Sequence, residues 1–445
     1  MPNEHPVVQA FRRAAEGVPS YGRILREAGV RPQSVESLED FLRLVPVIDK
    51  PSTFGRFPVE ELCMDGRLPA LAGVLTSSGH SGQFAFGLYD FPGAEGETRR
   101  VDDALDALFA VRARSTLLVN CLPMGVKVPT RLCTLAETSV RADMAAALVA
   151  QFGRHFQQVV LVGETAFIKH LLEMGRKGGI DWKRSVVHVV VGEEPLAENA
   201  RTYLAGILGI DPDRGENGHI LSSMGVAELG LNLFSENPSL VAMRRRLHQD
   251  GVLRETLLGP EATTVPSVFT YDPSRIFVEI GPQGELILST LDLQRPLPLI
   301  RYATSDRGAF PSPRAMDAIR QQCPAPTAGA DTPILLVFGR GQRAMAGASP
   351  VYPEQVKEGL YHDAALAGQT TGNFRIRSGK EAATLRIQLS PGVAADARIE
   401  AQFSAAMTFY VRAPIRVRCE NYESFTGGMA LDYERKFDYL ESADP

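Results

Sequence analysis

Short apolar runs separated by helical patterns fill the first half of the chain. The runs are rich in β-branched residues and short enough to be buried strands; they are Leu71–Leu75, Thr116–Asn120, Val159–Val162 and Ser185–Val191. Apolar residues recur at helical spacing in the segments around them, namely Val7–Val45, Arg100–Val111 and Glu137–Phe152. Strands that alternate with helices predict an α/β fold, in which a parallel sheet is flanked by helices and preceded by short helices.

The pattern changes after Ala262. Short β segments separated by proline and glycine turns follow one another at Ser267–Tyr271, Arg275–Ile280 and Glu285–Thr290, which predicts an antiparallel or barrel-like region. Residues 312–332 are rich in proline, alanine and glutamine, a composition typical of a loop or linker. From Ile334 onward, β and α signals alternate to the C-terminus. We therefore expect a large N-terminal domain (residues 1–338) and a small α+β C-terminal domain (residues 339–445).

Composition describes an ordinary globular protein. The chain has 445 residues, of which 44% are hydrophobic and 22% charged, and its net charge is −5. This charge provides no basic footprint for nucleic acid. Five scattered cysteines without zinc-site spacing suit a reducing compartment. The sequence shows neither a signal-peptide pattern nor an apolar run near the ~18 residues of a membrane helix, so we expect a soluble cytoplasmic protein without a membrane partner.

The segment Thr76–Gln83 is the first candidate for chemistry. It combines hydroxyl side chains with two glycines directly after an apolar run. Gly79 and Gly82 can adopt positive φ, which lets backbone N–H groups converge on phosphate oxygens, and the hydroxyls add further donors. Local sequence alone also fits an ordinary turn.

Two further candidates follow strands. Gly192-Glu193-Glu194-Pro195 lies between the apolar run ending at Val191 and a helix predicted over Ala197–Leu208, and α/β folds bind ligands at the carboxyl ends of such strands. A plain strand-to-helix connection is the alternative. Glu228 stands among small and apolar residues after Met224-Gly225, where a carboxylate needs a cation such as nucleotide-bound Mg²⁺. A solvated glutamate that begins a helix is the alternative there.

Asp306 and Arg340 complete the set. An apolar strand end at Leu299-Ile300 delivers Asp306 into a turn, where its carboxylate could accept hydrogen bonds from ribose hydroxyls or begin an Asx-turn. Gly339-Arg340-Gly341 lies at the expected domain boundary and suits either a hinge or an ordinary glycine turn.

In this order, the segments resemble the adenylate-forming superfamily, and within it the phenylacetate–CoA ligase-like branch. The resemblance covers nearly the whole chain and includes Val18–Tyr21, Leu44–Lys50 and Thr371–Ile376 in addition to the candidates above. It implies a large α/β N-terminal domain, a small mobile C-terminal domain, and ATP-dependent activation of a carboxylic acid to an acyl adenylate. The acyl group would then pass to a thiol, with coenzyme A as the expected co-substrate. The resemblance leaves open whether the protein is a homodimer.

The resemblance also implies roles for individual residues. Phosphates would be bound by the Ser/Gly loop, at Thr76, Ser77, Ser78, Gly79, Ser81 and Gly82. Adenine would pack against the turn that contains Gly192, Glu193 and Pro195, beside Met224 and Gly225. Glu228 would hold Mg²⁺, Asp306 would bind the ribose, and Arg340 would belong to the hinge.

Several positions depart from the family pattern. The loop reads His80-Ser81-Gly82-Gln83 where many members carry a lysine, so His80 is a candidate replacement donor. The segment before Glu228 lacks the usual tyrosine and threonine. Lys436 is the candidate for the catalytic lysine near the C-terminus, and Lys380 is the alternative residue. Lys436 could also be an ordinary solvated charge on the surface.

Two functions therefore compete. The first is an acid–thiol ligase that uses ATP, Mg²⁺ and coenzyme A. The second is a catalytically impaired protein on the same fold that binds a nucleotide or acyl ligand, which the missing loop lysine favours. The apolar content of Asn120–Thr130 suits an aryl or apolar acid, whereas Lys127 would suit a second anionic group.

Overall fold

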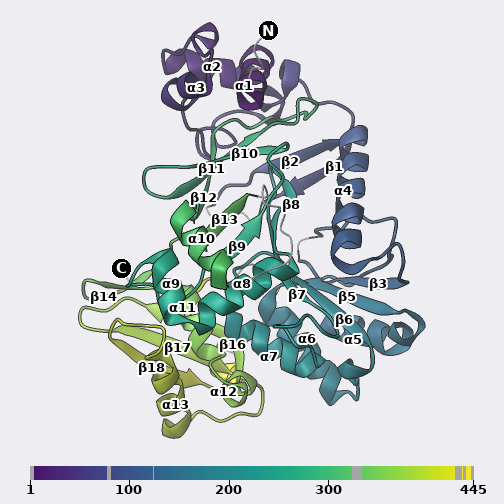
Figure 1. The fold of residues 1–445 in the computed structure, drawn as a ribbon, viewed down its shortest axis with the longest axis vertical. Coiled ribbons are helices and arrows are strands. Elements are labelled where there is room, and N and C mark those ends of the chain that lie inside the picture. Colours follow the sequence, from purple (N-terminus) through teal and green to yellow (C-terminus); the bar gives the residue numbers. More distant parts are fainter. Residues whose placement is uncertain are drawn as a thin grey trace.

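The computed structural model describes residues 5–77, 82–123, 125–322, 333–425, 433 and 437–441. Three short helices open the chain, as the sequence predicts: α1 (Pro6–Gly17), α2 (Pro19–Glu27) and α3 (Leu38–Leu44). Proline occupies the first turn of α1 and α2, where its missing N–H costs nothing, and the Ser37 hydroxyl caps α3. The three helices form the end of the molecule farthest from the C-terminal elements, at the top of Figure 1.

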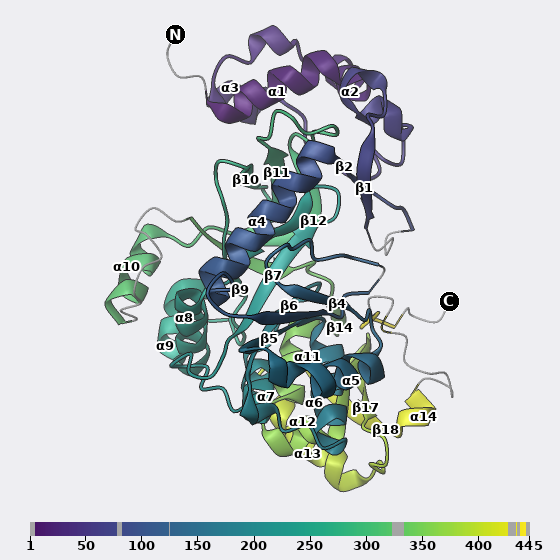
Figure 2. The same cartoon turned by 90° about the vertical axis from the view of Figure 1, so that its right-hand side faces the viewer.

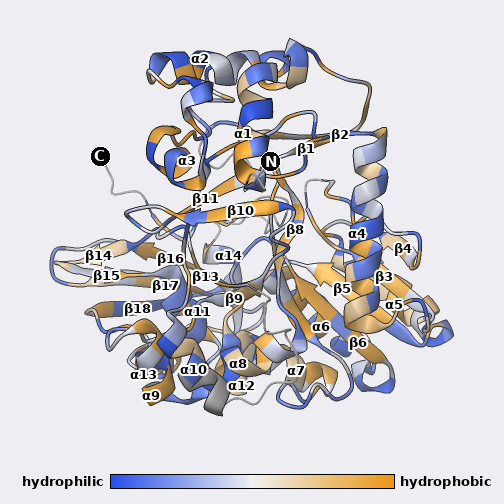
Figure 3. Cartoon of the chain, turned by 45° about the horizontal axis from the view of Figure 1, so that its top comes forward, coloured by the Kyte–Doolittle hydropathy of each residue, from blue (hydrophilic) through white to orange (hydrophobic). Residues whose placement is uncertain are grey.

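An eleven-stranded sheet runs through the described part of the chain in the order β10-β11-β12-β13-β9-β8-β7-β6-β5-β3-β4. Its parallel half consists of β3 (Thr116–Asn120), β4 (Thr134–Glu137), β5 (Gln158–Gly163), β6 (Val186–Val191) and β7 (Ile220–Val226). β3 and β5 are buried along their whole length. In Figure 3 the strands of this half are largely orange, the colour of hydrophobic residues. The parallel sheet expected from the apolar runs is therefore confirmed.

The other half of the sheet is antiparallel, which confirms the prediction for the segments after Ala262, whereas its first strand along the chain precedes Ala262 and is not predicted by the sequence. It contains β8 (Gly230–Ser235), β9 (Ser267–Thr270), β10 (Ile276–Ile280), β11 (Glu285–Thr290), β12 (Tyr302–Ala309) and β13 (Ile334–Gly339). The two halves join where β7 pairs in parallel with β6 and antiparallel with β8. The sequence predicts both halves but not their union into one sheet, because pairing between distant strands leaves no local pattern.

The helices of this large part are α4 (Phe91–Phe109), α5 (Ala142–Phe152), α6 (Thr165–Lys177), α7 (Glu198–Leu208), α8 (Pro238–Gln249), α9 (Gly251–Leu258) and α10 (Pro313–Gln322). Figure 2 shows α4 as a long helix that runs from the level of β2 down past β12 and β7. The predicted helix Arg100–Val111 is the second half of α4, which begins at Phe91 because Asp90 caps it and Pro92 fits its first turn.

Three predictions about local structure are confirmed only in part. The strand at Leu71–Leu75 exists as β1 (Leu71–Thr76), but it alternates between half-buried and exposed in a two-stranded sheet with β2 (Phe86–Asp90). The helix expected from Glu137 begins only at Ala142, because residues 134–137 pair with β3 as an edge strand. The linker expected at residues 312–332 begins with helix α10, whose first turn is capped by the Ser312 hydroxyl.

The chain after Gly339 forms separate sheets, and we call its elements the C-terminal unit. They are β14 (Ala344–Ala346), β15 (Ser349–Val351), α11 (Pro353–Leu360), α12 (Ala364–Gln369), β16 (Thr370–Arg377), β17 (Ala383–Leu389), α13 (Ala397–Met407), β18 (Ile415–Glu420) and α14 (Tyr422–Phe425). β16 and β17 are antiparallel, and β17 and β18 are parallel.

The C-terminal unit and the parallel half of the large sheet share one hydrophobic core. Helices α11 and α12 pack against α7, and β16 packs against α6. Buried Tyr361 and Phe374 from the unit belong to the same cluster as Phe167, Tyr203 and Leu204 from the large part. We call this contact surface the seam; it lies below the sheet in Figure 2.

Candidate active site

The turn Gly192–Pro195 lies at the carboxyl end of β6, where the sequence places it. Gly192 N–H donates to the Gly163 carbonyl of neighbouring β5 (3.1 Å), and Glu193 takes a left-handed conformation with φ of 71°. Because Val191 pairs with Ser222 of β7, the turn lies next to the part of β7 that contains Met224 and Gly225. These two predicted elements of an adenine site are therefore adjacent.

The C-terminal unit covers this turn. The Glu194 carboxylate accepts hydrogen bonds from Lys357 Nζ at 2.5 Å and from the Tyr439 hydroxyl at 2.8 Å. Gly339 leaves β13 with φ of 78°, and a Cβ there would lie 2.6 Å from Glu354 Oε1 and 3.6 Å from Pro195. Glycine is thus required where the chain passes from the large sheet into the C-terminal unit between the turn and α11.

Carboxylates concentrate at this end of the seam. Glu164, which caps α6 by accepting from Ala166 N–H, is half-buried there. Burial, reinforced by the negative charge of Glu194, raises the pKa of Glu164 to about 8, so its carboxyl group carries a proton at neutral pH. Burial also raises the pKa of Glu354. The positive charge of Lys357 acts in the opposite direction and offsets part of the rise in the pKa of both groups.

The predicted phosphate loop connects the antiparallel strands β1 and β2. Ser77, which follows β1, closes the hairpin: its N–H donates to the Ala85 carbonyl, and its hydroxyl accepts from Ala85 N–H, both at 2.9 Å. At the other end Gly82 has φ of 75°, the positive value expected for it. Thr76 is the last residue of β1, whereas Ser78, Gly79, His80 and Ser81 lie outside the described residues.

A lysine that sequence reasoning did not assign to the loop lies beside it. Lys50 Nζ donates to the Ser77 hydroxyl at 3.1 Å. Lys50 is brought there because Ile48, two residues earlier, pairs with Tyr302 at the start of β12. The segment Leu44–Lys50 was part of the family resemblance, but nothing in its local pattern indicates that it reaches residue 77.

Glu228 is buried in the turn between β7 and β8, with 4% of its surface exposed. It therefore does not begin a helix, which removes the solvated alternative. The Tyr302 hydroxyl donates to Glu228 Oε1 at 2.5 Å, and burial together with the Glu228 charge raises the pKa of Tyr302, so the phenol keeps its proton. β2 also approaches this turn closely, since a Cβ on Gly87 would lie 2.1 Å from the Ala227 carbonyl oxygen.

Asp306 lies within β12, not in a turn after a strand end. Ala303 pairs with Ile287, and Arg307 pairs with Glu285. The paired positions are therefore four residues apart on β12 but only two residues apart on β11. The extra residues form a bulge in which Ser305 takes φ of 69°, and bulges commonly redirect a side chain at a site. The half-buried Asp306 occupies this bulge on the strand that begins at Tyr302.

The basic candidates are placed less completely. Arg340 follows β13 directly and is exposed, as a hinge residue would be. Lys380 is exposed in the turn between β16 and β17. Lys436 lies outside the described residues. In the described part of the chain, no group of three or more His, Cys, Asp or Glu residues could hold a metal ion, and no helix is long and apolar enough to cross a membrane.

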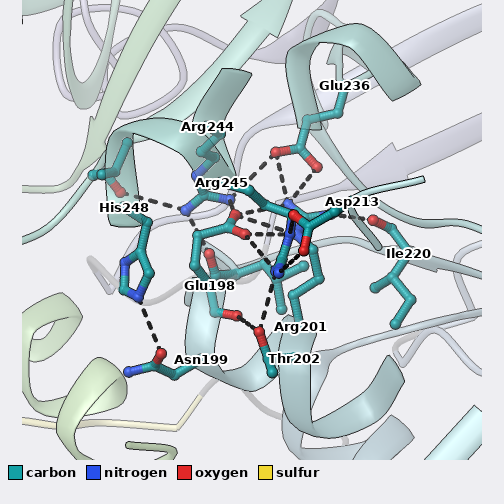
Figure 4. A network of polar contacts seen from close by, with 12 residues as sticks. Glu198, Asn199, Arg201, Thr202, Asp213, Ile220, Glu236, Arg244, Arg245 and His248 are labelled. Atoms are coloured by element: carbon teal, nitrogen blue, oxygen red, sulfur yellow. Dashed lines mark hydrogen bonds and ion pairs between the residues drawn. The ribbon is translucent and has the colours of Figure 1, made fainter. Parts of the chain in front are cut away.

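A buried ionic network lies behind the turn (Figure 4). Arg201 bridges Glu198 and Glu236 at 3.1 and 2.9 Å, and Arg244 contacts the same two carboxylates at 3.1 and 3.3 Å. Arg244 also donates to the Leu196 carbonyl at 2.5 Å, while Glu236 accepts from Ser222 N–H at 2.7 Å. The network thus fixes the backbone just after the Gly192–Pro195 turn to the start of β7. Sequence reasoning missed it, because each member resembles an ordinary charge on a helix.

Comparison with known proteins gives a match in structure only. No family model matches the chain, and no curated protein matches it in sequence. Among solved structures, a 2-hydroxyisobutyryl-CoA ligase in the postadenylation state, in complex with 2-HIB-AMP, matches with a TM-score of 0.67 at 15% identity, covering 98% of this chain and 88% of the ligase. The chain has the fold of the adenylate-forming CoA ligases.

Two further structures support this fold assignment. The same ligase in complex with 2-HIB-AMP and CoA, in the thioesterification state, matches with a TM-score of 0.53 at 15% identity and the same coverage of both chains. An anthranilate CoA ligase in complex with anthranoyl-AMP matches with a TM-score of 0.51 at 12% identity, covering 91% of this chain and 77% of the ligase. The α/β fold with a C-terminal unit, as expected from the sequence, is therefore confirmed.

Proposed function

We propose that this protein activates a carboxylic acid with ATP to an acyl adenylate and transfers the acyl group to a thiol, with coenzyme A as the acceptor. The observation that carries the proposal is the meeting of Lys50, Ser77 and Glu228, which are far apart in the sequence, around the start of β12. Neighbours of the same fold have been captured with acyl-AMP, which supports this chemistry.

The reaction explains why these residue types are needed. In the first step a substrate carboxylate oxygen bonds to the α-phosphorus of ATP, the bond from that phosphorus to the bridging oxygen breaks, and pyrophosphate leaves. Two anions must approach each other, so positive charge and positioned donors lower the barrier. Lys50 and the backbone and hydroxyl donors of the Ser/Gly loop would stabilise the phosphates, with His80 as a further donor.

Mg²⁺ fits this site as a companion of the nucleotide. Mg²⁺ is usually held by one or two protein carboxylates together with substrate phosphates and water, so Glu228 alone would suffice from the protein side. The Tyr302 hydrogen bond would hold the Glu228 carboxylate in place. Asp306 would accept from the ribose hydroxyls, and the turn at Gly192, Glu193 and Pro195 would pack against adenine, beside Met224 and Gly225.

The second step requires a different arrangement of the same parts. A thiolate attacks the acyl carbonyl of the adenylate, a carbon–sulfur bond forms, and AMP leaves. We propose that the C-terminal unit moves about Gly339-Arg340 between the two steps, with residues 1–338 and 339–445 as the moving parts. Its present arrangement resembles the postadenylation state more than the thioesterification state of the 2-hydroxyisobutyryl-CoA ligase, with TM-scores of 0.67 and 0.53.

Pyrophosphate exchange tests the proposal. Wild-type protein, Mg²⁺, ATP and a panel of aryl and aliphatic acids should give exchange with at least one acid, and coenzyme A should convert it to thioester. Lys436→Ala should slow adenylate formation by roughly two orders of magnitude, as expected for an electrostatic stabiliser, while transfer from a supplied acyl adenylate survives. Lys380→Ala is the matched control and should leave both steps unchanged.

The outcomes separate the competing functions. Binding of Mg·ATP without exchange for any acid would favour the impaired nucleotide-binding protein, to which the missing loop lysine points. Loss of adenylation in Lys380→Ala instead of Lys436→Ala would show that the catalytic lysine is assigned to the wrong residue.

A further inference from the structure

Helix α7 begins without a cap of its own. Its N-cap residue is Ala197, whose side chain cannot accept a hydrogen bond. The first N–H groups of a helix have no partner within the helix, and leaving them buried and unpaired is costly. Glu198, at the first position, is fully buried. An acceptor must therefore come from elsewhere in the fold.

That acceptor belongs to the C-terminal unit. Glu358, on α11, accepts from Glu198 N–H at 2.8 Å and from Asn199 N–H at 3.0 Å, one bond to each carboxylate oxygen. Only 2% of its side chain is exposed. A carboxylate at this position also interacts favourably with the positive end of the helix dipole. Glu358 thus caps a helix of the other part of the molecule, across the seam.

Asn199 reinforces the same contact. Its side-chain amide donates to the Glu358 carbonyl at 2.9 Å and to the Tyr410 hydroxyl at 2.7 Å, both in the C-terminal unit. Its amide oxygen faces His248 Nε2 at 3.0 Å. The N–H groups of Glu198 and Asn199 and the Asn199 amide donor therefore have these partners only while the unit is docked, whereas the contact with His248 lies within the large part.

The head of α7 is also tied to the candidate active site. Glu198 follows Pro195 of the predicted adenine turn by three residues, and its carboxylate is part of the buried ionic network that holds the Leu196 carbonyl (Figure 4). The backbone that Glu358 caps is thus rigidly connected to the turn. The contacts that Glu358 makes with the start of α7 and those of the ionic network with Leu196 therefore connect the docked C-terminal unit to the turn.

We infer that Glu358 is a positioning residue that selects the docked arrangement of the C-terminal unit and so favours adenylate formation over thioester formation. This inference rests on the proposed function for its catalytic consequence. When the unit leaves the seam, the N–H groups of Glu198 and Asn199 lose their acceptor, so Glu358 favours the docked arrangement and opposes its release.

Two variants and a matched control test the inference. Glu358→Ala removes the cap, while Glu358→Gln keeps an acceptor oxygen but loses the charge. Glu261→Gln breaks another ion pair between the large part and the C-terminal unit, Glu261 with Arg412 at 2.7 Å, but the Glu261 side chain is 86% exposed, and such pairs contribute little. Spin labels, one on each side of the seam, report the docked fraction by their distance distribution, and the two half-reactions are measured separately.

The ratio of docked to undocked molecules should fall roughly tenfold in Glu358→Ala, the size of a lost helix cap, and less in Glu358→Gln. Adenylate formation should fall in the same order, while transfer from a supplied acyl adenylate stays equal or becomes faster. Glu261→Gln should match the wild type. A wild-type distance distribution and an unchanged ratio of the two half-reactions in both Glu358 variants would overturn the inference. If the wild type forms no adenylate, the proposed function fails, and the distance distributions still decide whether Glu358 holds the unit.

Discussion

The seam and the site formed by Lys50 and Ser77, which we call the phosphate edge, both contain polar side chains from distant parts of the sequence, yet they differ in burial. At the seam, Glu358 is almost completely enclosed and accepts from backbone N–H groups, and the less deeply buried Lys357 and Glu194 pair with each other. At the phosphate edge, Lys50 and Ser77 are only half-buried. Buried charges must be paired within the fold, whereas half-exposed donors can exchange a protein partner for a ligand.

This difference assigns different tasks to the two regions. The seam fixes how the parts of the molecule are arranged, because separating them would leave buried groups unpaired. The phosphate edge suits an anionic ligand, because the ligand's oxygens can accept the hydrogen bond that Lys50 now donates to Ser77. Mutations at the seam should therefore change arrangement and stability, and mutations at the edge should change ligand affinity.

The largest expected effect comes from Gly87→Ala, which sharpens the definition of the phosphate edge. The added methyl group would overlap the Ala227 carbonyl oxygen and push the turn that carries Glu228. Overpacking of this kind costs about 1–3 kcal/mol of unfolding free energy, and a shift of about 1 Å in a catalytic group can cost about a hundredfold in rate. We expect adenylate formation to fall by roughly that factor in the pyrophosphate-exchange assay.

Gly73→Ala is the control for this change. It lies on the partner strand β1, where a Cβ would have nothing within 4 Å. Wild-type exchange in both variants would show that the position of Glu228 does not matter for the reaction.

A second, smaller effect is expected for Lys50→Ala. Losing the one cation placed at Ser77 in the described structure should weaken Mg·ATP binding roughly tenfold, the value of one charge-assisted hydrogen bond. Stability should change little, because the side chain is only half-buried. Calorimetry measures the affinity, with Lys127→Ala as the control, since Lys127 is 76% exposed. Equal affinities for the wild type and Lys50→Ala would remove this lysine from the phosphate site.

The last prediction is a pH dependence of the free energy of unfolding, which originates at the seam. The pKa of Glu164 is raised by burial, so the folded protein holds a proton that the unfolded chain releases. Its stabilising contribution is complete below its ordinary pKa near 4.5 and is lost as pH rises through about 8. The free energy of unfolding should therefore decrease between pH 5 and 8, by at most about 1.4 kcal/mol per pH unit for one proton.

Glu164→Gln isolates this term. The glutamine can still accept from Ala166 N–H but does not titrate, so denaturant unfolding should show a flatter pH profile than the wild type. If the free energy of unfolding depends on pH in the same way in both proteins, Glu164 does not hold the proton. The seam would then bind its charged groups no more tightly than the phosphate edge does.

The sequence determined the fold class, the parallel strands β3, β5 and β6, the antiparallel region after Ala262, and the position of the turn at Gly192. These follow from local rules, because strand and helix periodicity and turn residues act over a few neighbouring positions. Where local rules competed, the predictions are confirmed only in part: Ser312 and Pro313 start α10 within a stretch whose composition is typical of a linker.

The assembly of the candidate site depends on tertiary contacts between distant segments. The partners of Glu228, Ser77 and the head of α7 are Tyr302, Lys50 and Glu358, at separations of 74, 27 and about 160 residues. No local pattern encodes such pairs, because each partner taken alone is an ordinary polar residue on a strand, loop or helix. They meet because β12 pairs with the segment at Ile48 and because α11 packs on α7, and both contacts bury apolar residues of these elements in the hydrophobic cores.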